Sequence, residues 1–163
     1  MDFIWQDYSP ETMGYVEHWL DSSAVASTGL DEGFGAFYQY WAQEDGFAVG
    51  ENFWCKVVFA DGVPVAVTAL CLHEETTAVM QIIVAPNKRG QGIGTKLLKQ
   101  LLEDDGVLGF AIEKSDAVIY PDNIASQKAF EKAGYRHFRT HQDENGTSLH
   151  YIYVRASDTL KMT

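Results

Sequence analysis

The segment VAPNKRGQGIGTKLL, residues 84–98, places three glycines within five positions, after a Lys-Arg pair and before paired leucines. A β-rich run precedes the segment, and the spacing of apolar residues predicts a helix from about Gly92 to Glu103. The start of a helix presents unpaired backbone N–H groups and the positive end of the macrodipole. Glycines let a ligand approach those groups without meeting a Cβ. The segment therefore predicts a cradle for a phosphate or pyrophosphate group.

Two common phosphate-binding loops do not fit this segment. A Walker A loop ends in G-K-[ST], whereas the order here is Gly94, Thr95, Lys96. A dinucleotide fingerprint needs a third glycine where Leu97 stands. That fingerprint also follows the first strand of a βαβ unit, not a set of antiparallel strands in the middle of the chain. Both of these nucleotide-binding classes are therefore disfavoured.

The pattern that does fit is Arg-x-x-Gly-x-Gly, formed by Arg89, Gly92 and Gly94 after a Val-x-Pro strand end. It resembles the acetyl-CoA-binding segment of the GNAT N-acetyltransferase superfamily. A second stretch, NIASQKAFEKAGY at residues 123–135, resembles the next conserved segment of that family, a helix that ends in a Gly-aromatic pair. The two motifs cover roughly residues 78–135. The resemblance implies one α+β domain over residues 1–163, with a mixed, mostly antiparallel central sheet flanked by helices on both faces.

The remaining sequence agrees with this fold class. The expected elements are a strand at 2–8, helices at 9–23 and 32–45, strands at 52–60, 63–72 and 76–86, a strand at 116–121, a helix at 124–133 and a final hairpin around Asn145–Gly146. Asp61–Gly62 predicts a two-residue turn. In a regular ladder around that turn, Cys55 faces Thr68 and Cys71 faces Asn52. The two thiols then lie on opposite faces, and we expect no disulfide.

The family resemblance implies that acetyl-CoA is a co-substrate. Its pantetheine arm would pair with the main chain at the end of the strand before the glycines, and its pyrophosphate would rest on the loop amides. The residues implied in cofactor binding are Ile82, Ile83, Val84, Arg89, Gly90, Gln91, Gly92, Ile93, Gly94, Thr95, Asn123, Ser126 and Phe130. A plain buried strand and a helix N-cap are alternative explanations for the first three residues and for Asn123. Lys88, Lys96 or Lys99 could meet the 3′-phosphate, although a solvated helix face accounts for each.

The implied reaction is direct attack of a neutral amine on the thioester, which requires a base for the ammonium and a stabilised oxyanion. The catalytic residues of the family do not carry over. Many relatives have a Tyr seven residues after the Asn, but this position is Phe130, and residues 79–84 and 117–120 contain no acid. The candidates are Tyr120, at a strand end, and His73 or Glu74, just before the central strand. For each of them, a packed or solvated side chain is the alternative.

His137 and His141 share a strand face without a third ligand, so we expect no metal.

Charge is divided unevenly along the chain. The net charge is −11, which argues against nucleic acid as a partner. Residues 1–79 carry 13 acids and one base, whereas residues 80–163 carry 10 acids and 11 bases. In the first half, acids gather around aromatic residues; the acids are Asp31, Glu32, Glu44, Asp45 and Glu51, and the aromatics are Phe34, Phe37, Tyr38, Tyr40 and Trp41. This mixture favours a cationic acceptor amine. Packing of the aromatics in a core is the alternative.

The remaining features concern partners and location. The start of the chain has no basic region followed by a long apolar run, and no stretch approaches 18 apolar residues. We therefore expect a cytoplasmic protein without membrane contact, a monomer or a homodimer, acting on a small-molecule or peptide amine. Two other functions fit the sequence. One is a CoA-binding regulatory module without catalysis, and the other is an acyltransferase that uses a longer acyl-CoA.

Overall fold

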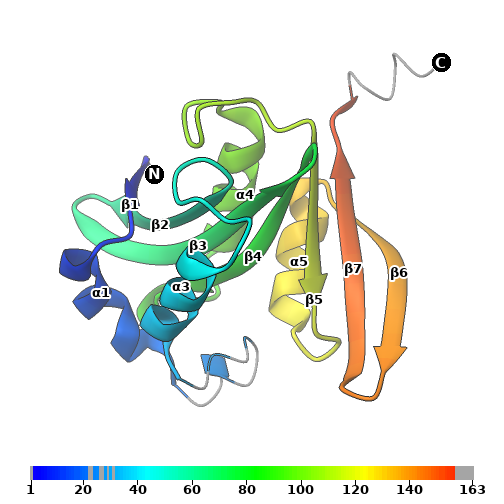
Figure 1. Cartoon of the computed structure of the whole chain (residues 1–163), viewed down its shortest axis with the longest axis horizontal. Helices are drawn as coiled ribbons and strands as arrows, with labels where there is room; N and C mark the ends of the chain where they lie inside the picture. Colours follow the sequence, from blue (N-terminus) through cyan, green and yellow to red (C-terminus); the bar gives the residue numbers. More distant parts are fainter. Residues whose placement is uncertain (1, 22–23, 26–27, 29, 31, 157–163) are drawn as a thin grey trace. The chain divides into compact units, whose positions relative to one another are not determined.

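The computed structural model describes residues 2–21, 24–25, 28, 30 and 32–156, which form a seven-stranded sheet with the strand order β1-β2-β3-β4-β5-β7-β6 (Figure 1). The β1–β2, β2–β3, β5–β7 and β6–β7 pairs are antiparallel, whereas β4 and β5 are parallel. The expected α+β class with a mixed, mostly antiparallel sheet is confirmed. The chain divides into two compact units, residues 1–71 with 80–91, and residues 72–79 with 92–163.

The first unit holds the N-terminal elements and the second half of β4. Its elements are β1 (Phe3–Asp7), α1 (Pro10–Val16), η1 (Glu17–Trp19), α3 (Phe34–Gln43), β2 (Phe53–Ala60), most of β3 (Val63–His73), the end of β4 (Thr76–Val84) and η2 (Pro86–Lys88). Ser9 precedes α1: its backbone N–H donates to Thr12 Oγ1 at 2.8 Å, and Thr12 N–H donates back to Ser9 Oγ at 3.4 Å. This reciprocal pair satisfies donors at the helix start.

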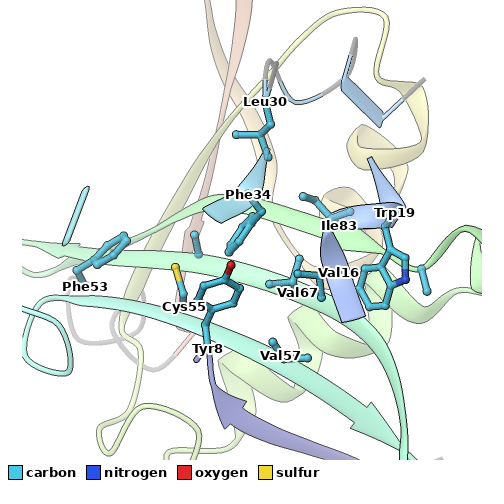
Figure 2. Close-up of a cluster of buried hydrophobic side chains, with 12 residues drawn as sticks. Tyr8, Val16, Trp19, Leu30, Phe34, Phe53, Cys55, Val57, Val67 and Ile83 are labelled. Carbon is cyan, nitrogen blue, oxygen red and sulfur yellow. The ribbon is translucent and has the colours of Figure 1, made fainter. Parts of the chain in front are cut away.

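The core of the first unit is aromatic (Figure 2). Tyr8 packs against Phe34 and Tyr38, with ring centroids 5.1 and 4.9 Å apart. Phe34 and Phe53 are fully buried, and Phe37, Tyr38 and Trp41 pack against the same cluster. Each fully buried aromatic of this kind contributes about 1.5–3 kcal/mol by leaving water. Most of the aromatics that suggested an acceptor site thus serve as core, and only Tyr40 is largely exposed, at 59%.

The β2–β3 hairpin corrects the expected cysteine geometry. Asp61 and Gly62 form its turn with φ of 52° and 77°. The register shifts between Val58 and Phe59, which pair with Ala66 and Pro64, so Val65 is the extra residue of a β-bulge. As a result, Cys55 faces Ala69 and Cys71 faces Phe53. Because Phe53 and Cys55 are two residues apart on one strand, both thiols project to the same face, not to opposite faces. The expectation failed because a β-bulge is not marked in the sequence pattern.

The second unit holds the start of β4, α4 (Ile93–Glu103), β5 (Lys114–Ile119), α5 (Ile124–Ala133), β6 (Arg136–Asp143) and β7 (Gly146–Val154). The helix that the spacing of apolar residues predicts is confirmed as α4, and five of those apolar residues are buried: Ile93, Leu97, Leu98, Leu101 and Leu102. A row of hydrogen-bonded polar groups lies in the interior of this unit. Tyr135 Oη lies 2.6 Å from Ser115 Oγ, which donates to the Thr77 carbonyl at 2.7 Å. Burial raises the pKa of Tyr135.

Among the residues that the structure describes, no helix combines the length and apolarity that a membrane crossing requires.

Candidate functional site

The loop that joins β4 to α4 adopts the backbone conformation that its glycines predict. Gly90 and Gly92 both have φ of 77°, in the left-handed region that favours glycine, and Gly92 is the N-cap of α4. A Cβ added at either position would meet none of the described atoms within 4 Å, so the space beside the loop is open. The first intrahelical bond runs from Lys96 N–H to the Gly92 carbonyl, at 3.1 Å. The amides of residues 93–95 therefore lack an acceptor within the helix.

Gly94 has a different role in the same loop. Its backbone is helical, and a Cβ placed there would lie 3.7 Å from Ala129 Cβ on α5. This glycine allows α4 and α5 to pack closely at the start of α4. An alanine fits at ordinary contact distance, whereas a larger side chain would press against α5. Thr95 is half-buried beside it, and Ile93 is buried.

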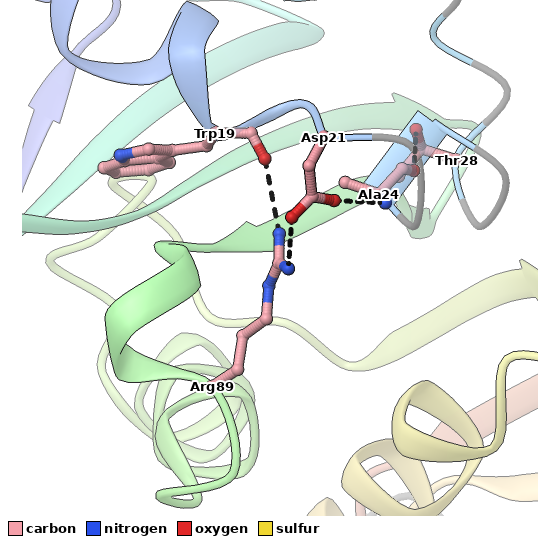
Figure 3. Close-up of polar contacts among 5 residues, drawn as sticks. All are labelled: Trp19, Asp21, Ala24, Thr28 and Arg89. Atoms are coloured by element: carbon pink, nitrogen blue, oxygen red, sulfur yellow. Dashed lines mark hydrogen bonds and ion pairs between the residues drawn. The ribbon is translucent and has the colours of Figure 1, made fainter.

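The Arg89 side chain is bound by the end of η1 and by the segment that follows it (Figure 3). Its Nη1 lies 3.1 Å from Asp21 Oδ2, and its Nη2 donates to the Trp19 carbonyl at 3.3 Å. The other carboxylate oxygen of Asp21 accepts from Ala24 N–H at 2.8 Å. The guanidinium is therefore engaged by residues of the first unit. Gln91 is also turned inward along the loop, with its amide donating to the Asn87 carbonyl at 3.2 Å.

The strand that leads to the loop pairs with β5 at its beginning. Thr76 pairs with Lys114, Thr77 with Ser115 and Ala78 with Asp116. Ala78–Asp116 is the last of these pairs, and Ile82, Ile83 and Val84 follow later in β4. The side chain of Ile83 is 5% exposed within the aromatic core, whereas those of Ile82 and Val84 are half-buried. Any contact of these three residues with a cofactor would therefore be made mainly by their backbone.

The second motif forms the start of α5. Asn123 is its N-cap, and its Oδ1 accepts from Ser126 N–H at 3.3 Å, so Asn123 has the structural role that the alternative explanation assigned. The Asn123 N–H donates to the Tyr120 carbonyl at 3.0 Å. Further along the helix, Phe130 is 2% exposed and packs edge-on against Tyr135, with centroids 4.8 Å apart. The Phe130 ring therefore has almost no free surface for a ligand within this unit.

The three expected catalytic residues lie in two places. Tyr120 follows β5 and is 45% exposed. Its carbonyl accepts a hydrogen bond from the N–H of Asn123 at the start of α5. His73 is the exposed last residue of β3, and Glu74 lies in the exposed turn before β4 with φ of 57°. The expected thioester-binding residues 82–84 end the same nine-residue strand. A strand of this length spans about 30 Å. The structure does not bring His73 or Glu74 to the glycine loop.

Sequence reasoning missed one polar pair in the second unit. His150 Nε2 lies 3.3 Å from Asp116 Oδ2, and the two side chains are 23% and 30% exposed. Asp116 comes just before the acid-free residues 117–120, and it lies inside β5 because that strand begins at Lys114. The pairing of β5 with β7 brings His150 beside this strand, and only that register reveals the pair.

The acids of the first half have varied surroundings. Asp7 pairs with Lys56 at 2.6 Å, and Glu17 Oε1 accepts from Gly35 N–H at 2.6 Å at the start of α3. Of the acids in the expected cluster, those within the described residues are exposed, and Asp31 lies outside them. These exposed acids are Glu32, Glu44, Asp45 and Glu51.

The two histidines considered as metal ligands lie on the edge strand β6. His137 stacks near Tyr151, and its Nε2 lies 3.0 Å from Thr140 Oγ1, whereas His141 lies 3.3 Å from Asp143. Within the described ranges, no three His, Cys, Asp or Glu side chains gather in a way that could hold a metal ion.

The fold and the loop define a class of α+β proteins in which a glycine loop links a central strand to a helix start. The sequence matches the Acetyltransferase (GNAT) family over residues 4–135. The chain belongs to this family. A comparison with curated protein sequences gave no match.

Solved structures support the same fold. Aminoglycoside acetyltransferase AAC(6')-Ib, solved with coenzyme A, gives a TM-score of 0.75 at 17% identity, covering 99% of this chain and 100% of its own. Spermidine N-acetyltransferase from Vibrio cholerae, solved with CoA and spermine, gives 0.72 at 13% identity, covering 94% and 96%. The ribosomal-protein-S18-alanine N-acetyltransferase from Escherichia coli gives 0.67 at 13% identity, covering 94% of each chain. At these identities the likeness shows the fold.

Proposed function

We propose that this protein transfers an acetyl group from acetyl-CoA to the primary amine of a small molecule or peptide, and that the acceptor is cationic. The observation that carries the proposal is the glycine loop. Gly90 and Gly92 have left-handed backbones beside open space, immediately before a helix whose first amides lack intrahelical acceptors. This is the arrangement in which a helix start binds a pyrophosphate. Membership of the acetyltransferase family supports acetyl-CoA as the carrier.

Each part of the carrier has a proposed position along the chain. The pyrophosphate lies on the amides of residues 89–95. The pantetheine arm pairs with the backbone of residues 82–84, which follow the last β4–β5 pair. Asn123 and Ser126, at the start of α5, lie beside the carrier. Phe130 supports this helix from inside through its contact with Tyr135.

The reaction begins with a neutral amine and ends with a free thiol. The amine nitrogen attacks the thioester carbonyl, the C–N bond forms, and the C–S bond breaks as the thiolate leaves. Backbone N–H groups near residues 82–84 stabilise the oxyanion, and one such donor is worth about 2.7–4 kcal/mol. Tyr120, the exposed residue after β5, is the candidate proton donor to the thiolate. A thiol with an ordinary pKa of about 8.5 leaves readily, so this donor adds only modestly to the rate.

The cationic acceptor is supported by two observations. Residues 1–79 carry 13 acids and one base. Four exposed acids lie close to α3 in the sequence, one before the helix and three after it: Glu32, Glu44, Asp45 and Glu51. Structural relatives of this chain act on amines according to their names, namely aminoglycosides and spermidine. Both of these amine classes are polycations.

The test combines binding and turnover. Calorimetry with CoA should give a saturable site, and thiol release should follow when acetyl-CoA is mixed with an amine panel. Spermidine, kanamycin and lysine peptides should outperform glutamate and aspartate. Binding without thiol release from any amine would favour the non-catalytic module, and faster turnover with butyryl-CoA than with acetyl-CoA would favour a longer acyl donor. A preference for the anionic amino acids would contradict the cationic acceptor.

A further inference from the structure

Thr68 is a polar residue in an apolar, buried part of β3. Its neighbours along the strand, Val67 and Ala69, belong to the aromatic core, where Figure 2 shows Val67. Since successive side chains of a strand project to opposite faces, Thr68 lies on the other face, with Ala66 and Leu70. Ala66 and Leu70 are fully buried, and Thr68 is 1% exposed. A hydroxyl in such surroundings needs a hydrogen-bond partner, because burying it without one costs free energy.

The partner of this hydroxyl lies on the strand proposed to hold the thioester. Thr68 Oγ1 donates to the Gln81 carbonyl at 2.8 Å. A threonine hydroxyl has one proton to donate, and this bond uses it. The Gln81 side chain is bound separately, since its Nε2 donates to the Thr28 carbonyl at 3.4 Å. All three residues belong to the first unit, and together they fix Gln81 through both its main chain and its side chain.

The Gln81 carbonyl and the Ile82 N–H belong to one peptide group. No peptide bond among the described residues is cis. In a planar trans peptide the C=O and the N–H point in opposite directions. Because the carbonyl points to Thr68 on β3, the Ile82 N–H points away from β3. Within β4 and β5, which are both fully described, the parallel pairs are limited to residues 76–78 of β4. The Ile82 N–H therefore points to the side of β4 on which strand pairing ends before this residue.

We propose that the Ile82 N–H is the donor that stabilises the oxyanion and that Thr68 is its positioning residue, an assignment that rests on the proposed function. The amine nitrogen adds to the thioester carbon, and the carbonyl electron pair moves to the oxygen, which accepts from the Ile82 N–H. When the pair returns, the C–S bond breaks. The nitrogen loses one proton and the sulfur gains one, giving the amide and the free thiol. Thr68 does not touch the reacting atoms; it fixes the plane of the peptide whose N–H does.

The expected effect falls on the chemical step. A donor stabilises developing charge best when it is already oriented, and removing one oxyanion donor costs about 10²–10³-fold in kcat. Thr68→Val keeps the shape of the side chain but frees the Gln81 carbonyl, so the peptide can turn. A misoriented donor should cost less than a missing one, and we expect kcat to fall about 10- to 100-fold. Thr68→Ser keeps the hydroxyl and should restore most of kcat. Calorimetry should show CoA affinity within twofold of the unmodified enzyme for both variants.

Thr12→Val is the matched control. Thr12 is also buried in the first unit, at 7% exposed, and its Oγ1 donates to the Ser9 carbonyl at 3.0 Å. The same substitution thus removes a buried hydroxyl that donates to a main-chain carbonyl at a distance in sequence from β4. Thr12→Val should lower stability at least as much, because its Oγ1 also accepts from the Ser9 N–H, and should leave kcat unchanged. An equal loss of kcat in the two variants would overturn the role of Thr68.

Infrared spectroscopy provides a measurement that packing alone does not change. The probe is acetyl-CoA with an isotopic label in its carbonyl, bound without an acceptor amine. A hydrogen bond to the thioester oxygen lowers the stretching frequency of this carbonyl. The frequency should be lower in the unmodified enzyme than in water, and it should return toward the value in water in Thr68→Val. Thr68→Ser and Thr12→Val should keep the lowered frequency.

The outcomes separate this assignment from the proposed function. If the unmodified enzyme binds CoA and releases thiol while Thr68→Val keeps both its kcat and its carbonyl frequency, the assignment is overturned alone. If the unmodified enzyme neither binds CoA nor releases thiol, both proposals are overturned. Should Thr68→Val fail to fold, the unmodified enzyme decides: a bound carbonyl with the same frequency as in water would overturn the assignment, and a lower frequency would support it.

Discussion

The glycine loop and helix α3 both stand out in the sequence, but their residues do different things in the fold. In the loop, Gly90 and Gly92 set a left-handed backbone, and the space beside them is open among the described residues. In α3, Phe34 is fully buried and Phe37 packs on it, with ring centroids 5.6 Å apart. A site built from a left-handed backbone can be recognised in the sequence, because few residues other than glycine adopt positive φ. A site built from side chains is not, because the same side chains also make cores.

The largest effect should come from Gly92→Ala. The added Cβ strains a residue at φ of 77° and occupies the face proposed for the pyrophosphate. We expect CoA to bind about 100-fold more weakly, or about 2.7 kcal/mol. Gly62→Ala is the matched control, because Gly62 also has φ of 77° and open space but lies in the β2–β3 turn. Calorimetry should show normal affinity for Gly62→Ala, and equal weakening in the two variants would remove the case for a backbone site.

The next effect concerns the second motif. Phe130→Tyr places a hydroxyl at the position where many relatives have a Tyr. Because Phe130 is 2% exposed and faces the Tyr135 ring, the new hydroxyl would be buried. We expect unfolding to become easier by about 1–3 kcal/mol, measured by urea denaturation. Phe138→Tyr, at a ring that is 58% exposed, should change stability little. A rise in kcat of Phe130→Tyr would instead show that α5 presents this ring to the thiolate.

The aromatic core makes a prediction at high pH. Burial, followed by the nearby Glu17 carboxylate, raises the pKa of Tyr8 to about 12 from 10.0. Since the folded state favours neutral Tyr8, this contribution to stability is fully present below pH 10 and is lost as pH rises toward 12. The Tyr8 hydroxyl finds no hydrogen-bond partner among residues 2–21, 24–25, 28, 30 and 32–156. Tyr8→Phe should therefore stabilise the protein by about 1 kcal/mol and flatten the alkaline loss. Lower stability of Tyr8→Phe at pH 8 would indicate that the hydroxyl is bonded.

The smallest effect should come from the ion pair between Arg89, beside the glycine loop, and Asp21, which follows η1 in the same unit. Asp21→Asn removes the ion pair that Asp21 forms with the Arg89 guanidinium, whose side chain is 37% exposed. Exposed pairs of this kind are worth about 0–1 kcal/mol, so we expect a small change in stability and a two- to fivefold change in CoA affinity. The control is Asp7→Asn, which breaks the Lys56 pair far along the sequence from the loop. Identical CoA affinity in both variants would show that Arg89 orientation is irrelevant to the loop.

Periodicity and turn residues predicted most of the fold. The leucine spacing of α4, the Asn123 cap and the Asp61–Gly62 turn are local signals, and all three are confirmed. The β2–β3 register was wrong because one extra residue, Val65, is passed over without any local marker. Asp116 and His150 were missed because they are 34 residues apart and meet only through strand pairing. Contacts of that kind depend on the tertiary register, which spacing along the chain does not encode.

The passed-over Val65 also determines what borders the strand proposed to hold the thioester. Because Ala69 opposes Cys55, Thr68 projects from the other face, and its hydroxyl donates to the Gln81 carbonyl at 2.8 Å, immediately before Ile82. Gaining or losing one residue in this hairpin would replace that hydroxyl with the methyl groups of Val67 or the methyl group of Ala69. Natural variants of this chain should therefore vary freely in hairpin composition but be constrained in hairpin length.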